Sequence, residues 1–178
     1  MRVLNKKFII VIDGPMGSGK TTVATILHKK LKRTAHLGLD RIKWFISDFK
    51  RIPKDNEIIR SVVVAMTKEY LKQGISVIVE QGMRKERIET LKKIATQNNA
   101  HFLAYQLTAS KEVLFDRVHQ RPHLSNRPKV TEARIERNYK AYLKSHKKPI
   151  ATLIDVENVT AQQVANRILK DLNSGAKG

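Results

Sequence analysis

The chain has 178 residues, 41% of them hydrophobic and 29% charged, a composition that indicates a globular protein and argues against disorder. Cysteine is absent, which excludes a disulfide scaffold, cysteine-ligated zinc, iron–sulfur clusters and a cysteine nucleophile. The 35 Lys and Arg against 16 Asp and Glu give a net charge of +19, which predicts an anionic partner.

The length predicts a single domain over residues 1–178. No apolar run approaches the roughly 20 residues of a membrane helix. The longest run, over 8–12, is too short for the apolar region of a signal peptide. We therefore expect a soluble, cytoplasmic protein with no membrane partner.

Short apolar strands alternate with amphipathic helices along the chain. Runs rich in β-branched residues predict strands over 8–12, 35–39, 76–79, 102–107 and 152–154. Apolar residues at helical spacing predict helices over 21–31, 42–49, 57–72, 85–98, 111–119, 131–145 and 160–172. This alternation is typical of a parallel sheet with helices on both faces. The expected fold class is α/β, with three layers and a five-stranded parallel sheet.

Three local features complete this expectation. Pro53 is expected to interrupt the helical pattern before the helix over 57–72. Gly74 is expected to cap the end of that helix. Residues 173–178 are expected to form a frayed tail. The inward face of the helix over 57–72 is predicted to carry Ile58, Val62, Ala65, Met66 and Tyr70.

Residues 14–21 read Gly-Pro-Met-Gly-Ser-Gly-Lys-Thr and fit the phosphate-binding pattern G-x-x-x-x-G-K-[ST]. Glycines let successive amides curl around a phosphate, and the following helix directs its N-terminal dipole at the same anion. Lys20 is expected to reach the β- and γ-phosphates, and the Thr21 hydroxyl to bind Mg²⁺. The residues expected to bind the nucleotide are Gly14, Pro15, Met16, Gly17, Ser18, Gly19, Lys20, Thr21 and Thr22.

On these residues the chain resembles the P-loop phosphotransferases. Among them it is most similar to the small kinases that include polynucleotide kinases, zeta-toxin-type kinases and chloramphenicol phosphotransferase. The resemblance extends over residues 8 to about 155. It implies a P-loop kinase fold in which the third strand lies beside the P-loop strand. It also implies transfer of the γ-phosphoryl group of ATP (or GTP), with Mg²⁺, to an acceptor hydroxyl.

Asp40 follows the second predicted strand. The resemblance implies that its carboxylate accepts a hydrogen bond from the acceptor hydroxyl and acts as general base. The alternative is that Asp40 caps the helix that begins near Ile42. Three residues on, polynucleotide kinases usually have an Arg that holds a phosphate of the acceptor. Here that position is Lys43, which offers a point charge and not a two-pronged fork.

Glu80 ends the third predicted strand. The resemblance implies that Glu80 orients Mg²⁺ through water, and the alternative is a strand-end carboxylate paired with a Lys or Arg. Arg84 follows four residues later, as in nucleoside monophosphate kinases, where such an Arg grips the acceptor phosphate. The alternative for Arg84 is an Arg on the surface at the start of a helix.

The segment 117–148, here called the lid segment, resembles the small basic lid of these kinases. A lid Arg closes over the phosphates, neutralises charge on the transferring group and excludes water. Arg117, Arg121 and Arg127 are candidates, and Arg121 is favoured. The alternative is a solvated basic loop. The segment holds ten Lys or Arg and two acids, a net charge of +8.

The acceptor stays open at this point. The charge favours RNA or DNA bound through the basic lid, with a 5′ end or a ribose hydroxyl as acceptor. Lys43, in place of a stronger phosphate clamp, favours a nucleoside, a sugar or an antibiotic. A non-catalytic nucleotide switch or nucleic-acid-binding protein is a third class, against which Asp40 and the lid arginines count. Trp44 is expected to pack beside the acceptor-side helix, and the histidines lack the spacing of metal ligands.

Overall fold

The computed structural model describes residues 6–80, 85–121, 130–145 and 151–175. A five-stranded parallel sheet with the order β2-β3-β1-β4-β5 forms its centre. Its strands are β1 (Phe8–Asp13), β2 (Thr34–Gly38), β3 (Ser76–Glu80), β4 (His101–Thr108) and β5 (Thr152–Asp155). The α/β class, the five parallel strands and the place of β3 beside the P-loop strand are therefore confirmed.

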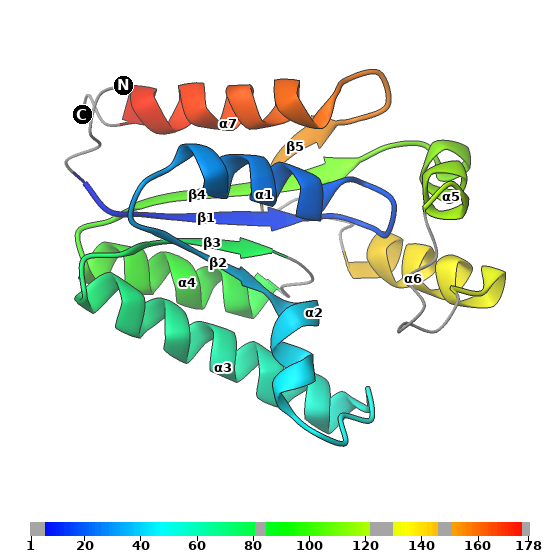
Figure 1. Ribbon diagram of the computed structural model, residues 1–178, viewed down its shortest axis with the longest axis horizontal. Coiled ribbons are helices and arrows are strands. Elements are labelled where there is room, and N and C mark those ends of the chain that lie inside the picture. Colours follow the sequence, from blue (N-terminus) through cyan, green and yellow to red (C-terminus); the bar gives the residue numbers. More distant parts are fainter. Residues whose placement is uncertain (1–5, 81–84, 122–129, 146–150, 176–178) are drawn as a thin grey trace.

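The helices are α1 (Lys20–Lys30), α2 (Leu39–Ile42), the 3₁₀ turn η1 (Lys43–Phe45), α3 (Pro53–Lys72), α4 (Lys85–Gln97), α5 (Lys111–His119), α6 (Glu132–Ser145) and α7 (Ala161–Gly175). In Figure 1, α1 and α7 cover one face of the sheet and α3 and α4 cover the other. The helices α5 and α6 lie beyond the carboxyl ends of the strands. Among the described residues, no helix is both long enough and apolar enough to span a bilayer.

The central strand β1 shows why its sequence is continuously apolar. Successive side chains of a strand point to opposite faces, so Phe8, Ile10 and Ile12 pack with α1 and α7. Ile9 and Val11 pack with α3 and α4 on the other face. All five side chains are at most 2% exposed. Burial on both faces fixes the end of β1 and therefore the start of the loop that follows it.

The inward face of α3 was predicted only in part: Met66 and Tyr70 pack against the core, whereas Ile58, Val62 and Ala65 are exposed. The apolar pairs 58–59 and 62–63 satisfy a helical spacing on either of two adjacent faces, so the local pattern does not choose between them. Packing against β3 and α4 chooses the second, and Ile58 and Val62 are exposed. The buried residues of α3 are Ile59, Val63, Thr67 and Leu71.

Of the two local predictions for the ends of α3, the one for Pro53 is wrong and the one for Gly74 is confirmed. Pro53 does not interrupt the chain but begins α3, because a first-turn residue needs no backbone donor. At the other end the expectation for Gly74 is confirmed: its φ is +75° and its amide donates to the Leu71 carbonyl at 3.1 Å. The next amide, of Ile75, donates to Tyr70 at 2.9 Å, which completes the left-handed cap.

Two further expectations need correction. The helix expected over 42–49 is replaced by the short α2 and by η1, and β2 already ends at Gly38. Asp40 therefore lies in the first turn of α2, and Gly38 occupies the N-cap position that was the alternative for Asp40. The expected tail from residue 173 is still helical up to Gly175.

Candidate active site

The P-loop, residues 14–21, connects β1 to α1 at the carboxyl edge of the sheet. Its glycines carry left-handed backbone angles, including φ +92° at Gly17. A Cβ at Gly17 would lie 2.4 Å from the backbone oxygen of Leu114 in α5. At Gly14 it would lie equally close, 2.4 Å, to the backbone oxygen of Leu107. The loop therefore packs backbone to backbone on β4 and α5, which leaves no room for side chains at these positions.

Gly17→Ala is expected to destabilise the fold more than the matched variant Gly74→Ala. Both positions have a positive φ, which costs a residue with a Cβ about 1–2 kcal/mol. Only Gly17 also meets backbone, since nothing lies within 4 Å of a Cβ at Gly74. We expect about 1–3 kcal/mol of additional loss for Gly17→Ala, measured by urea unfolding. Equal losses in the two variants would show that the contact with α5 does not constrain the loop.

Lys20 lies in the P-loop with a side chain turned back onto the loop. Its Nζ donates to the Pro15 carbonyl oxygen at 2.7 Å, and the residue is 8% exposed. A longer contact of 3.5 Å joins Nζ to Ser18 Oγ, so at least one of the three donors of the ammonium remains for a phosphate. Burial lowers the pKa of Lys20 to about 8.

Charged groups from separate elements surround this ammonium. The negative charges of Asp13, Glu80 and Asp40 raise the pKa of Lys20 against the effect of burial, and Arg121 lowers it further. The residues named from the sequence as base, magnesium ligand and lid cation therefore gather around one lysine. Arg121 is the second residue after α5 and the last described residue before position 130.

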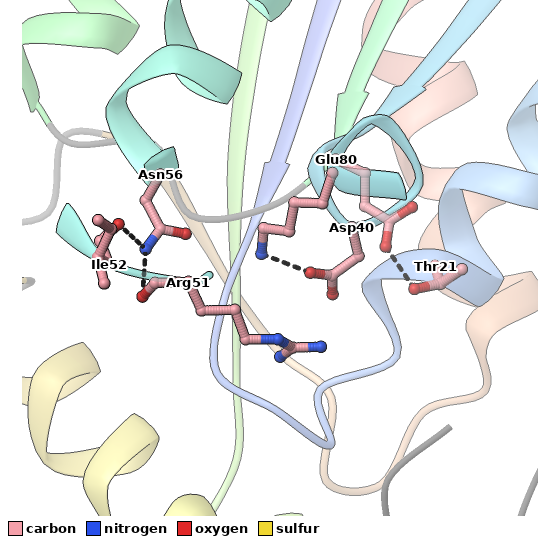
Figure 2. Close-up of polar contacts among 7 residues, drawn as sticks. Thr21, Asp40, Arg51, Ile52, Asn56 and Glu80 are labelled. Carbon is pink, nitrogen blue, oxygen red and sulfur yellow. Dashed lines mark hydrogen bonds and ion pairs between the residues drawn. The ribbon is translucent and has the colours of Figure 1, made fainter. Parts of the chain in front are cut away.

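Thr21 and Glu80 meet directly. The Thr21 hydroxyl donates to Glu80 Oε1, as Figure 2 shows, and His36 Nε2 lies 2.9 Å from the other carboxylate oxygen, Oε2. Gly38 makes room for this arrangement, because a Cβ there would lie 3.3 Å from Oε2. Although burial raises the pKa of Glu80, the hydrogen bonds from His36 and Thr21 and the nearby positive charge lower it below its usual range. Glu80 is thus held as a carboxylate.

A hydroxyl and a carboxylate beside a phosphate-binding loop fit the oxygen ligands that Mg²⁺ prefers. No cluster of three or more His, Cys, Asp or Glu side chains with metal-binding geometry occurs in the described part of the chain. This agrees with a Mg²⁺ ion that takes most of its ligands from nucleotide and water, as is usual for this ion. The alternative of a Lys or Arg partner for Glu80 is not realised among the described residues, where the neighbour of its Oε2 is the His36 ring.

Asp40 and Lys43 form an ion pair. Lys43 Nζ donates to Asp40 Oδ1 at 2.6 Å, and the dashed line to Asp40 in Figure 2 marks this contact. The Lys43 side chain is only 15% exposed, whereas that of Asp40 is 59% exposed. The lysine is therefore fixed beneath a carboxylate that faces solvent.

The remaining candidate arginines divide into two cases. Arg117 ties α5 to the loop after β5, because its Nη2 donates to the carbonyl oxygens of Val156 at 2.7 Å and Glu157 at 3.1 Å. This places its guanidinium in a backbone contact of the fold. Arg84 and Arg127 lie outside the described residues.

The helix α6 of the lid segment reaches the P-loop through Asn138. The Met16 amide donates to Asn138 Oδ1 at 3.0 Å. The helix is held on α5 by an ion pair of 2.9 Å between Lys111 and Glu136. The P-loop and the lid segment are therefore in direct contact in this structure.

Sequence reasoning missed His36, Asn138 and the surroundings of Trp44. The ring of Trp44 does not pack in the core: the residue is 55% exposed, and the Arg51 guanidinium lies 5.7 Å from the ring centroid. A polar His36 two residues before Gly38, in a strand otherwise expected to be buried, was a usable signal for a partner on the next strand. No local pattern marks Asn138, because its contact depends on how α6 packs.

The comparisons with known proteins agree with this geometry. The model of a family described as AAA domain matches residues 9–146. A sugar kinase from Janibacter sp. is 15% identical, with a TM-score of 0.67 and coverage of 96% of this chain and 98% of that one. A gluconokinase from Sinorhizobium meliloti is 14% identical, with a TM-score of 0.67 and coverage of 99% and 96%.

Shikimate kinase from Acinetobacter baumannii is similar as well. It is 20% identical, with a TM-score of 0.63, and the match covers 95% of this chain and 94% of that one. At such identities these structures show the fold, which is that of small P-loop kinases. The family model spans most of the chain, and the P-loop of the sequence lies at the carboxyl edge of a parallel sheet. This protein therefore belongs to the AAA domain family and has the fold of its kinase-like P-loop members.

Proposed function

We propose that this protein is an ATP-dependent phosphotransferase that moves the γ-phosphoryl group to a hydroxyl of an acceptor. The observation that carries the proposal is the gathering of Asp40, Glu80 and Arg121 around Lys20 of the P-loop. Phosphoryl transfer is catalysed mainly by positioning and by electrostatic stabilisation. This arrangement supplies cations for the phosphates and carboxylates for the metal and the acceptor.

On the nucleotide side, the P-loop amides and Lys20 bind the phosphate tail, and GTP fits the same cradle. Thr21 and Glu80 would hold Mg²⁺, which when bound neutralises charge on the phosphates. His36 fixes the Glu80 carboxylate through the 2.9 Å contact, so that its other oxygen is directed to Thr21. Arg121 places a further positive charge near Lys20, where charge spreads during transfer.

On the acceptor side, Asp40 accepts the proton of the attacking hydroxyl. Its side chain is 59% exposed, and it lies close enough to Lys20 to affect the titration of that lysine. Lys43 donates to one oxygen of Asp40 and orients the carboxylate. Arg84 is proposed to contribute to acceptor binding, although it lies outside the described residues.

Two acceptor classes have support of different kinds. The structural neighbours are named for small acceptors, among them a sugar kinase and shikimate kinase. The net charge of +19 supports RNA or DNA, because a polynucleotide backbone rewards many cations. Steep loss of acceptor affinity with rising salt is the property that separates the second class from the first.

The test is transfer of radiolabelled γ-phosphate to a panel of 5′-hydroxyl RNA and DNA, intact tRNA, nucleosides, sugars and sugar acids, each at two salt concentrations. Labelling of an alcohol that depends on Lys20 supports the proposal. The polynucleotide class requires that labelling of RNA or DNA falls about tenfold or more over a few-fold rise in salt. Binding of Mg·ATP without transfer to any hydroxyl would favour a nucleotide switch and overturn the kinase assignment.

Nucleotide affinity is expected to fall as the pH rises above about 8. Lys20 has a pKa of about 8 in the free protein, and bound phosphates raise it, so binding above that pH requires uptake of a proton. Below pH 8 the lysine is already charged, so it adds no pH dependence to the nucleotide affinity. Calorimetry at pH 8 in buffers of different ionisation enthalpy should record uptake of about half a proton. Lys20→Arg, which stays charged, is the control, and an equal uptake in that variant would contradict the assignment.

A further inference from the structure

Arg51 occupies a strained turn between η1 and α3. Its φ is +56°, a left-handed conformation that is unfavourable for a residue with a Cβ. The side chain of Asn56 holds the turn, since its Nδ2 donates to the carbonyl oxygens of Arg51 at 2.9 Å and Ile52 at 2.8 Å. Asp55 Oδ2 accepts a hydrogen bond of 2.8 Å from the Lys50 amide on the other side. The fold therefore maintains an unfavourable backbone angle at one arginine.

The strained turn directs Arg51 toward the acceptor side of the site. Figure 2 shows its side chain extending from the turn to a position beneath the Asp40 carboxylate. Its guanidinium lies 5.7 Å from the centroid of the Trp44 ring, an arrangement that supports a planar cation on an aromatic face. Trp44 is the one tryptophan of the chain.

A second arginine comes to the same place from the lid segment. Arg134 in α6 is half-buried, and burial lowers its pKa. Arg51 lowers that pKa further and Asp40 raises it, so both groups lie within electrostatic reach of Arg134. The turn before α3 and the first turn of α6 thus place Arg134 within electrostatic reach of both Arg51 and the proposed base.

This cluster carries more positive charge than it neutralises. Asp40 is bonded to Lys43, and neither Arg51 nor Arg134 forms an ion pair in the described part of the chain. Arg51 is exposed and Arg134 is partly buried, and like charges held near each other repel unless an anion joins them. Arginine forks match the paired oxygens of a phosphate or a carboxylate.

We propose that Arg51 and Arg134 bind an anionic group, a phosphate or a carboxylate, carried by the acceptor alcohol whose hydroxyl faces Asp40. The inference rests on the proposed function and narrows its substrate class to alcohols that bear such a group. Asn56 is a positioning residue, because it acts on the acceptor through the backbone of Arg51.

The first test measures anion binding at Arg51 and Arg134, and it does not require that the acceptor is known. Inorganic phosphate and, separately, acetate are titrated into the protein while the P-loop is filled with Mg²⁺ and a non-hydrolysable ATP analogue. The fluorescence of Trp44 reports binding, with calorimetry as the second readout. Arg51→Gln and Arg134→Gln are each expected to weaken anion binding by about tenfold or more, the loss of one charge-assisted contact.

Arg167→Gln is the matched control, because this arginine is exposed on α7, which covers a sheet face away from the lid segment. It should bind the anion as the unchanged protein does. No response of the unchanged protein to either anion, or equal affinities in all three variants, would overturn the proposal. Binding of the nucleotide analogue is recorded in the same samples, so loss of anion binding at the two arginines is distinguished from loss of nucleotide binding at the P-loop.

The second test compares acceptors that differ only in the anionic group: gluconate with sorbitol, and glycerol 3-phosphate with glycerol. We expect a preference of about tenfold or more in kcat/KM for the charged member, and the two pairs separate carboxylate from phosphate. Arg51→Gln and Arg134→Gln should raise KM for the charged member and leave the KM of ATP unchanged. Asn56→Ala should raise the same KM by a smaller factor. Equal use of charged and neutral members would overturn the proposal.

Discussion

Lys20→Ala is expected to reduce phosphoryl transfer by about 10²–10³-fold, the usual effect of removing one donor that stabilises developing charge. Nucleotide affinity is expected to fall with it, by about 10–100-fold, because charge-assisted contacts to the phosphates are lost. The reason is geometric: the ammonium is held in the P-loop by Pro15 and Ser18, and at least one of its three donors remains for a phosphate. Initial rates of γ-phosphate transfer and calorimetric titration of Mg·ATP measure the two losses separately.

The fold of this variant is expected to survive. Lys20 is almost fully buried, and the fall of its pKa from 10.5 to about 8 corresponds to a cost of roughly 3 kcal/mol for keeping it charged. Alanine removes that cost at neutral pH, so urea unfolding should show no loss of stability. Lys29→Ala, an exposed lysine on the same helix, is the control and should keep both affinity and rate. Affinity for Mg·ATP that is unchanged in Lys20→Ala would exclude the P-loop as the nucleotide site.

The parts of the fold that were predicted correctly are those specified by neighbouring residues. A strand buried on both faces must be continuously apolar, so the run over 8–12 could be read directly. The cap at Gly74 depends on one residue without a Cβ. The inward face of α3 could not be predicted in this way, because two faces fit the pattern and contacts with distant elements decide between them.

The same distinction separates the site residues. The P-loop binds through consecutive backbone amides, so its place is visible in eight adjacent residues, 14–21. The contact of His36 with Glu80 requires the pairing of β2 with β3, and that pairing is not local. Arg51 and Arg134 come within electrostatic reach of each other only because the fold brings the turn held by Asn56 near the helix α6. Single residues whose neighbours come from other elements carry no sequence pattern.

The cations around Asp40 also explain why the sequence left the acceptor open. Lys43 was read as a weak phosphate clamp because it stands where related kinases have an arginine. In the structure Lys43 binds Asp40, and the guanidinium groups come from residues 51 and 134. A clamp assembled from another turn and another helix does not follow the spacing of the family pattern. The acceptor chemistry therefore depends on Asp40 and its cations taken together.

Asp40→Asn is expected to reduce phosphoryl transfer by about 10²–10⁴-fold, the range for loss of a positioned general base. Affinity for Mg·ATP should change far less, because the Asp40 side chain is 59% exposed and its charge is the last of those that raise the pKa of Lys20. Single-turnover transfer and nucleotide titration on the same preparation measure the two effects. Asp48→Asn, at an exposed position shortly after η1, is the control and should leave both unchanged.

Lys43→Met separates the two roles that Asp40 can have. If Asp40 only holds Lys43 in place, removal of either partner of the 2.6 Å pair should lower the rate to a similar extent. If Asp40 takes the proton of the acceptor, Asp40→Asn should lower the rate by a much larger factor, since Lys43→Met leaves the carboxylate in place. Loss of nucleotide affinity equal to the loss of rate in Asp40→Asn would remove the role of general base. In that case the acceptor hydroxyl would have to be activated by a group other than the first-turn carboxylate of α2.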